Sequence, residues 1–221
     1  MIATLISTST QTLYACGPFI WMIAGLLGAG YLIKLIKTRK TEGTKLGVLG
    51  MKGAGKTTYL AHLGLVERND GGTTVATYEG RKVNVGHREM DIAAGKDIGG
   101  DEFMNYYKSW LVGSEKKDII IFIFDGYRYL KSEDYRHDTD ARLQFIYKNY
   151  KAGNRNRKGY KNLVVIASHL DEYERSADDM CQDILTLVGR KDYLAMFQTN
   201  FFATDMRKRD WIMDINLKIF A

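Results

Sequence analysis

The sequence has few of the residues that hold small domains together covalently or through metals. Its 221 residues include two cysteines, Cys16 and Cys181, and Cys16 lies in an apolar N-terminal stretch, which excludes a disulfide scaffold. No group of histidines and cysteines has the spacing of a structural zinc site. Proline occurs once, as Pro18. With 45% hydrophobic and 12% aromatic residues the chain can build a core, so disorder is excluded as a description of the whole chain.

Charge is absent from residues 1–33. Within this stretch, residues 15–33 are 19 uncharged and mostly apolar residues, close to the length of helix that crosses a bilayer core. Basic residues follow this apolar run and none precedes it; they are Lys34, Lys37, Arg39 and Lys40. A secretory signal peptide needs a basic segment before its apolar run, so this order favours a membrane anchor.

We therefore predict that residues 1–40 form a transmembrane anchor and a basic juxtamembrane linker, with residues 13–36 in the lipid bilayer. The positive-inside rule makes this a single-pass protein with its N-terminus outside and everything after Lys34 in the cytoplasm. A signal peptide and a buried core helix remain the alternatives for this segment. Ala24 and Gly28 are small residues four apart, which would let a second transmembrane helix approach, so a homo- or hetero-oligomer stays open.

The segment after the linker, residues 45–60, reads KLGVLGMKGAGKTTYL. An apolar strand pattern is followed at 50–57 by a full match to G-x-x-x-x-G-K-[ST], and then by a helical pattern over 58–67. Glycines let successive backbone N–H groups point at phosphates, and the helix N-terminus adds its dipole. Lys56 would reach the β- and γ-phosphates, and Thr57 would bind Mg²⁺. The residues expected to bind nucleotide here are Gly50, Lys52, Gly53, Ala54, Gly55, Lys56, Thr57 and Thr58.

A second motif, D-I-G-G at 97–100, precedes a continuous apolar run at 119–125 that is typical of a strand buried on both faces of a parallel sheet. Together with the phosphate loop, these motifs resemble the small GTPases, and within them the branch of Arf and the signal recognition particle receptor β-subunit. The resemblance runs from residue 45 to the C-terminus. It implies that Asp97 holds Mg²⁺ through water and that the N–H of Gly100 senses the γ-phosphate.

The resemblance also implies a group of residues that recognises the nucleotide base. A buried strand pattern at 163–167 leads into S-H-L-D, where the family has N-K-x-D. Asp171 is retained and would accept hydrogen bonds from guanine, and the backbone N–H of Ala203 would be offered to the guanine oxygen. Ser168 and His169 depart from the family pattern, which weakens the guanine prediction and keeps an ATP-using P-loop protein open.

Two further features of the sequence bear on the rate of GTP hydrolysis. Thr73, Thr74 and Thr77 are candidates for the switch I ligand of Mg²⁺, and Thr74 before Val75 fits the family best. Asp101 stands where the family has the glutamine that orients the attacking water, and an ionised carboxylate cannot donate a hydrogen bond. Hydrolysis of GTP is therefore predicted to be slow or partner-dependent. The residues expected to act in it are Lys56, Thr74, Gly100 and Asp101.

These observations predict that residues 41–221 form one α/β P-loop domain with a doubly wound, mostly parallel sheet, small GTPase-like in fold. The protein would bind GTP or GDP with Mg²⁺ and would switch or scaffold a protein effector at the cytoplasmic membrane face. A non-catalytic, GTP-bound adaptor is the second hypothesis. We do not expect a nucleic-acid partner, because the acidic stretches at 133–140 and 171–179 interrupt an otherwise basic chain of net charge +6.

Overall fold

The computed structural model describes residues 43–67, 76–85, 88–97, 103–113, 115–153, 162–198 and 200–220. The chain divides into two compact units, Met1–Glu42 and Gly43–Ala221, and all described residues belong to the second. The predicted anchor therefore lies outside the described residues. Within the described ranges, no helix has both the length and the apolar character needed to span a membrane.

The centre of this unit is a parallel sheet with the strand order β1-β6-β7-β8. Its strands are β1 (Leu46–Gly50), β6 (Ile119–Asp125), β7 (Leu163–Ser168) and β8 (Phe201–Ala203). Every residue of β1 and β7 is buried, which explains why these segments are apolar without alternation. The predicted α/β class with a parallel sheet is thus confirmed.

A hairpin made of two separate two-stranded sheets accompanies the parallel sheet, and the sequence patterns did not predict it. Its arms are β2 (Ala76–Tyr78) with β3 (Arg81–Val85), and β4 (Arg88–Ile92) with β5 (Gly95–Asp97). The antiparallel pairs Ala76↔Asp97 and Val85↔Arg88 belong to one register, so the four short strands are a single interrupted hairpin.

The hairpin is attached to the parallel sheet through residues just before β1. Thr44 pairs in parallel with Ile92, its N–H donating to the carbonyl of Asp91 at 2.7 Å. The hairpin therefore lies on the side of β1 away from β6, with the returning arm next to β1. This arrangement brings β5, which ends at Asp97, beside β1 and α2 (Lys56–His62).

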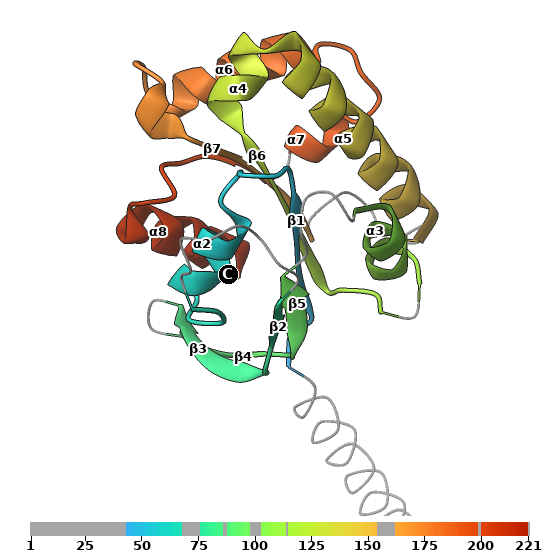
Figure 1. Cartoon of the computed structure of the whole chain (residues 1–221), viewed down its shortest axis with the longest axis vertical. Coiled ribbons are helices and arrows are strands. Elements are labelled where there is room, and N and C mark those ends of the chain that lie inside the picture. Colours follow the sequence, from blue (N-terminus) through green and yellow to red (C-terminus); the bar gives the residue numbers. More distant parts are fainter. Residues whose placement is uncertain are drawn as a thin grey trace, which may run out of the picture. The chain divides into compact units, whose positions relative to one another are not determined.

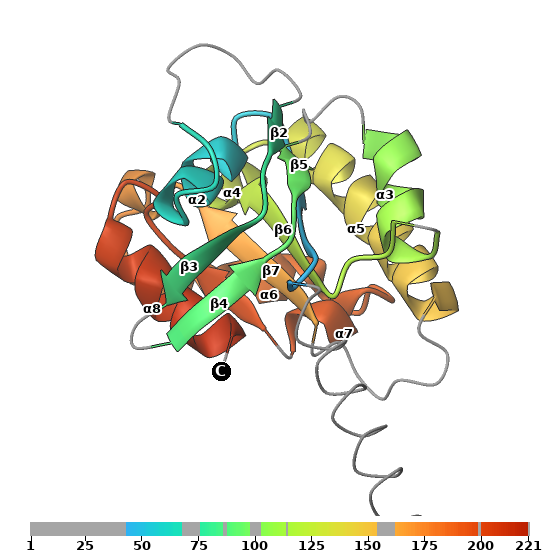
Figure 2. The same cartoon turned by 90° about the horizontal axis from the view of Figure 1, so that it is seen from below.

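Helices cover both faces of the sheet, as a doubly wound fold requires. Figures 1 and 2 show α2 and α8 (Arg209–Ile219) on one face, and α3 (Phe103–Leu111) and α5 (Glu133–Gly153) on the other. The remaining helices are α4 (Gly126–Lys131), η1 (Leu170–Glu172), α6 (Ala177–Val188) and α7 (Leu194–Phe197). The helix predicted over 58–67 is shorter than expected, because the chain turns at Gly64 with a φ of 69°.

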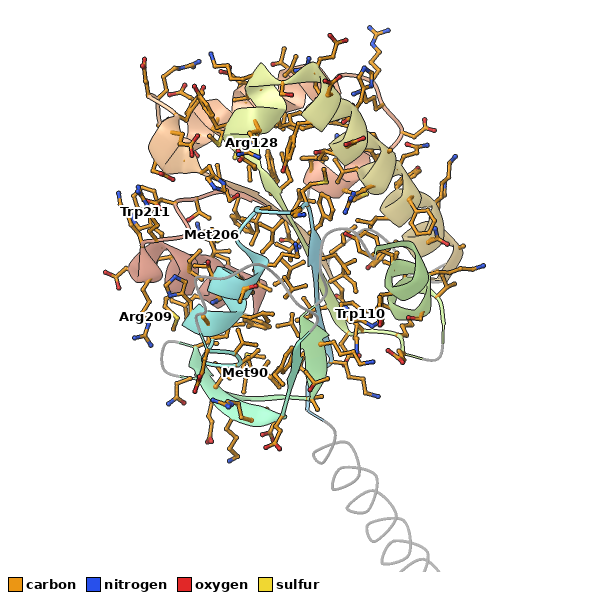
Figure 3. The ribbon with its side chains drawn as sticks, viewed as in Figure 1. Met90, Trp110, Arg128, Met206, Arg209 and Trp211 are labelled. Atoms are coloured by element: carbon orange, nitrogen blue, oxygen red, sulfur yellow. The ribbon has the colours of Figure 1, made fainter. Side chains whose placement is uncertain are left out.

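The core lies between the sheet and these helices. The middle of β6 is completely buried, as expected for a segment with no chemistry of its own. Trp110 of α3 packs on β1 (Figure 3), and Gly47 makes room for it, because a Cβ at Gly47 would lie 2.8 Å from the indole ring.

Candidate functional site

The loop between β1 and α2 has the shape of a phosphate cradle. The N–H of Met51 donates to the carbonyl of Ile123 at 3.0 Å, which fixes the start of the loop to β6. Gly50 sits so close to β6 that a Cβ there would clash with the carbonyl oxygen of Ile123. At Gly53 the φ is 75°, and an added Cβ would meet nothing within 4 Å, so this glycine borders open space. Only glycine adopts such a conformation readily, and the curled backbone it allows can point its N–H groups at an anion.

Lys56 is the charged centre of this loop. Its side chain is 3% exposed, and the ammonium donates to the carbonyl oxygens of Met51 at 2.8 Å and of Gly50 at 3.4 Å. A buried cation must be paired or hydrogen-bonded, and here loop carbonyls satisfy it. The residues present therefore fit a bound phosphate group: a curled loop open at Gly53, with a desolvated lysine held against it.

The rest of the predicted phosphate and metal set is described in part. Thr57 and Thr58 lie half-buried in the first turn of α2, and Lys52 is exposed at the loop tip. Asp97 ends β5 beside this helix, and the structure describes its backbone but not its side chain. Thr74, Gly100 and Asp101 also lie outside the described residues. In the described ranges, no group of three or more His, Cys, Asp and Glu side chains could hold a metal.

The end of β7 carries a second cluster of polar groups. Ser168 is fully buried, and its hydroxyl donates to the carbonyl of Phe124 at 3.1 Å and lies 2.9 Å from Nδ1 of His169. His169 has a φ of 60°, and the same ring nitrogen is 3.5 Å from the buried carboxylate of Asp125. That carboxylate also caps α4 by accepting the N–H of Arg128 at 2.9 Å. Ser168 and His169, which stand where small GTPases have Asn and Lys, thus both contact residues of β6.

The predicted base-reading carboxylate already has a cationic neighbour. Nη2 of Arg207 lies 3.1 Å from Oδ2 of Asp171 and 3.1 Å from Oδ2 of Asp205. Asp205 is 2% exposed, and the guanidinium beside it holds the pKa of its carboxyl below the usual range. Nothing in the sequence patterns indicated this ion-pair group, because its members come from separate loops after β7 and β8.

Ala203 lies within β8 rather than in the loop that follows. Its backbone faces the thiol of Cys181 in α6, and burial raises the pKa of that thiol to about 11. It is the loop after β8 that contacts the phosphate loop. In this loop, the side chain of Met206 (labelled in Figure 3) packs against Gly55. The backbone carbonyl of Met206 lies 2.8 Å from Nε2 of His62.

The loops after β1, β7 and β8 thus meet at one edge of the sheet, at the carboxyl ends of parallel strands. Ligands of open α/β sheets bind at this edge. The phosphate loop, its buried lysine and the parallel sheet define the class of this domain as a P-loop-like α/β fold.

Comparisons with known proteins add little to this classification. No family model matches the sequence, and no curated protein matches it. Among solved structures, the GDP-bound RocCORdC part of Roco2 from Methanosarcina barkeri matches with 16% identity and a TM-score of 0.47. The match covers 80% of this chain and 49% of that one, so the chain spans about half the length of the Roco2 structure.

Proposed function

We propose that this chain is a membrane-anchored, small GTPase-like protein that binds GTP or GDP with Mg²⁺ and switches or scaffolds a protein effector. The observation that carries the proposal is the position of Lys56, buried against the carbonyls of a glycine-rich loop between β1 and α2. In the same loop, a Cβ added at Gly53 would meet nothing within 4 Å, so the loop also borders the open space that a bound phosphate needs.

Each part of the site has a role in this proposal. Lys56 and the backbone N–H groups of the loop hold the phosphates, and Asp171 reads the base. Thr57, Asp97 and Thr74 would hold Mg²⁺, which neutralises charge on the β- and γ-phosphate oxygens when bound. Hydrolysis would be phosphoryl transfer to water, slow in the isolated protein because Asp101 cannot donate a hydrogen bond when ionised.

The membrane part of the proposal rests on the sequence. Residues 13–36 would cross the bilayer once, and the basic residues after them would keep residues 41–221 in the cytoplasm. The effector would read the segments around Thr74 and Gly100, whose order in such proteins depends on the γ-phosphate.

Nucleotide content and turnover of the full chain test the proposal. The protein is purified in detergent, its co-purifying nucleotide is extracted and identified, and phosphate release is followed with GTP and with ATP. Bound GDP with slow GTP turnover supports a switch that needs a partner. A chain that holds neither nucleotide, and whose Lys56→Ala variant behaves identically, would overturn the proposal.

Two other functions have specific support. Asp101 at the glutamine position favours a non-catalytic adaptor that keeps GTP as a structural cofactor, and intact GTP without phosphate release identifies it. Ser168 and His169 favour an ATP-binding protein, because neither is the family residue and both are engaged with β6. Competition of a labelled nucleotide by ATP but not by GTP identifies that case.

A further inference from the structure

Arg207 links two loops at the base end of the candidate site. Its side chain forms a two-pronged ion pair with Asp205, with Nε 3.0 Å from Oδ1 and Nη2 3.1 Å from Oδ2. The backbone N–H of Arg207 also donates to Oδ1 of Asp205 at 2.9 Å. The second contact of Nη2, at 3.1 Å, is to Oδ2 of Asp171 after β7. One guanidinium therefore joins the loop after β8 to the loop after β7.

The two carboxylates differ in burial, and this difference decides which one anchors the arginine. The carboxylate of Asp205 is 2% exposed, and its partners among the described residues all belong to Arg207. The carboxylate of Asp171 is 21% exposed and is held through one oxygen. Asp205 is thus the buried carboxylate that anchors Arg207, and Asp171 is the more exposed of the two carboxylates.

The backbone reinforces this link. The N–H of Leu170 donates to the carbonyl of Thr204 at 3.3 Å, and the N–H of Thr204 donates to the carbonyl of Ala167 at 2.9 Å. These two hydrogen bonds hold the two segments together independently of Arg207. The guanidinium then bridges their two carboxylates. Without the guanidinium, two carboxylates would face each other at the ends of neighbouring strands, and like charges at such a separation repel.

We propose that Arg207 is a positioning residue for base specificity: anchored on the buried carboxylate of Asp205, it fixes Asp171 to read a guanine base. This inference rests on the proposed function, because it assumes that a nucleotide base reaches Asp171. Oδ1 of Asp171 has no hydrogen-bond partner in the described part of the chain, and Oδ2, which accepts from Arg207, keeps a second lone pair, so both oxygens can still accept hydrogen bonds.

Guanine offers a ring N–H and a 2-amino group as neighbouring donors, and a carboxylate accepts from both only when its orientation is fixed. Hypoxanthine has the same ring N–H and carbonyl but no 2-amino group. The preference for GTP over inosine triphosphate therefore reports on the orientation of Asp171 and not on phosphate binding. A purely structural role for Arg207 would change the affinities for both nucleotides equally.

The experiment measures the dissociation constants of GTP and inosine triphosphate for the full chain, by competition with a fluorescent guanine nucleotide. For Arg207→Ala we expect the preference for GTP to fall about tenfold, with the inosine triphosphate affinity little changed, since charge-assisted hydrogen bonds contribute on this scale. The matched control is Arg209→Ala, because Arg209 is exposed at the start of α8, carries the same charge and belongs to no described ion pair. It should keep the wild-type preference.

A second variant covers the case in which Arg207→Ala does not fold because Asp205 is left buried and unpaired. The double variant Asp205→Asn with Arg207→Gln removes both charges while leaving a polar amide at each position, and it should lose the preference as well. An unchanged preference in either folded variant, or an equal loss in Arg209→Ala, would overturn the inference.

Asp171→Asn separates this inference from the proposed function. If the wild type prefers GTP and Asp171→Asn abolishes that preference while Arg207→Ala does not, Arg207 has no positioning role and guanine binding stands. If the wild type shows no preference and Asp171→Asn changes nothing, guanine reading itself is wrong, and the inference falls with it.

Discussion

The hydroxyl of Tyr107 accepts a hydrogen bond from the backbone N–H of Gly50 at 3.0 Å. This contact joins α3, the helix after the D-x-G-G motif, to the first glycine of the phosphate loop. Tyr107 is 1% exposed, and burial raises the pKa of its hydroxyl to about 12, so the group stays neutral. A hydrogen bond with Arg142 of α5 involves the same hydroxyl and acts on its pKa in the opposite direction.

Tyr107→Phe should therefore loosen the phosphate loop without emptying the core. Removal of the hydroxyl leaves the Gly50 N–H buried without this acceptor, which costs about 1–3 kcal/mol in the free energy of unfolding. We expect faster nucleotide dissociation as well, measured by chase of a fluorescent nucleotide from the full chain.

Tyr135→Phe is the matched control, because the hydroxyl of Tyr135 accepts the N–H of Asp125 at 2.8 Å at the end of the neighbouring strand β6. The two variants should lose similar stability, and only Tyr107→Phe should release nucleotide faster. Equal dissociation rates in both variants would mean that the Tyr107 contact is purely structural.

Lys56→Ala should weaken nucleotide binding by at least about a hundredfold, because it removes a desolvated cation from the phosphate site. Calorimetric titration of the full chain with GTP measures this change. Lys108→Ala, at an exposed position of α3, removes the same charge away from the loop and should change the affinity by less than about threefold, as exposed charges usually do. Comparable losses in both variants would show that general electrostatic attraction, rather than the buried lysine, binds the phosphates.

Two glycines of the loop should respond differently to the same methyl group. At Gly50, alanine would force the backbone away from the carbonyl of Ile123, so we expect a drop of several °C in the unfolding temperature, on the order of that for other overpacked cores. At Gly53, alanine meets no neighbouring atom and pays mainly for its positive φ, about 1 kcal/mol. Gly53→Ala should therefore fold and lose nucleotide affinity, since its methyl group would project into the open space. A normal affinity in Gly53→Ala would place the phosphates elsewhere.

The sequence was most informative where one short segment determines both fold and site. The phosphate loop, with its strand and helix, is contained in residues 45–60, and the apolar runs at 119–125 and 163–167 show directly which strands are buried on both faces. The hairpin of β2 to β5 was missed, because its strands are short, interrupted and mostly polar on the outside.

The contacts of the base end could not be read from the sequence for a different reason. Asp171, Asp205 and Arg207 are ordinary charged residues in polar loops, and only the parallel pairing of β7 with β8 brings them together. The hydrogen bond between Tyr107 and Gly50 was not predicted either, because the sequence of α3 indicates only a helix. Asp171 lies in η1, just after β7. Its role in base recognition and the roles of Thr74, Gly100 and Asp101 remain predictions.

The Asp205–Arg207 pair should also make stability depend on pH in the acid range. The guanidinium lowers the pKa of the Asp205 carboxyl in the folded protein, so the unfolded chain takes up a proton at a higher pH than the folded one does. The ionised pair therefore stabilises the fold fully above the unfolded pKa, and this stabilisation is lost as the pH falls through the folded pKa.

Urea unfolding of the full chain, measured from pH 7 down to about pH 3, tests this dependence. Asp205→Asn should be less stable than the wild type at neutral pH, and the difference should shrink as the pH falls, because the variant has no carboxyl to protonate at this position. Asp192→Asn, at an exposed position before α7, controls for the change in net charge and should keep the wild-type slope. If the curves of the wild type and Asp205→Asn run parallel down to the lowest pH, Arg207 does not stabilise the ionised form of Asp205, and the base-positioning role would lose its anchor.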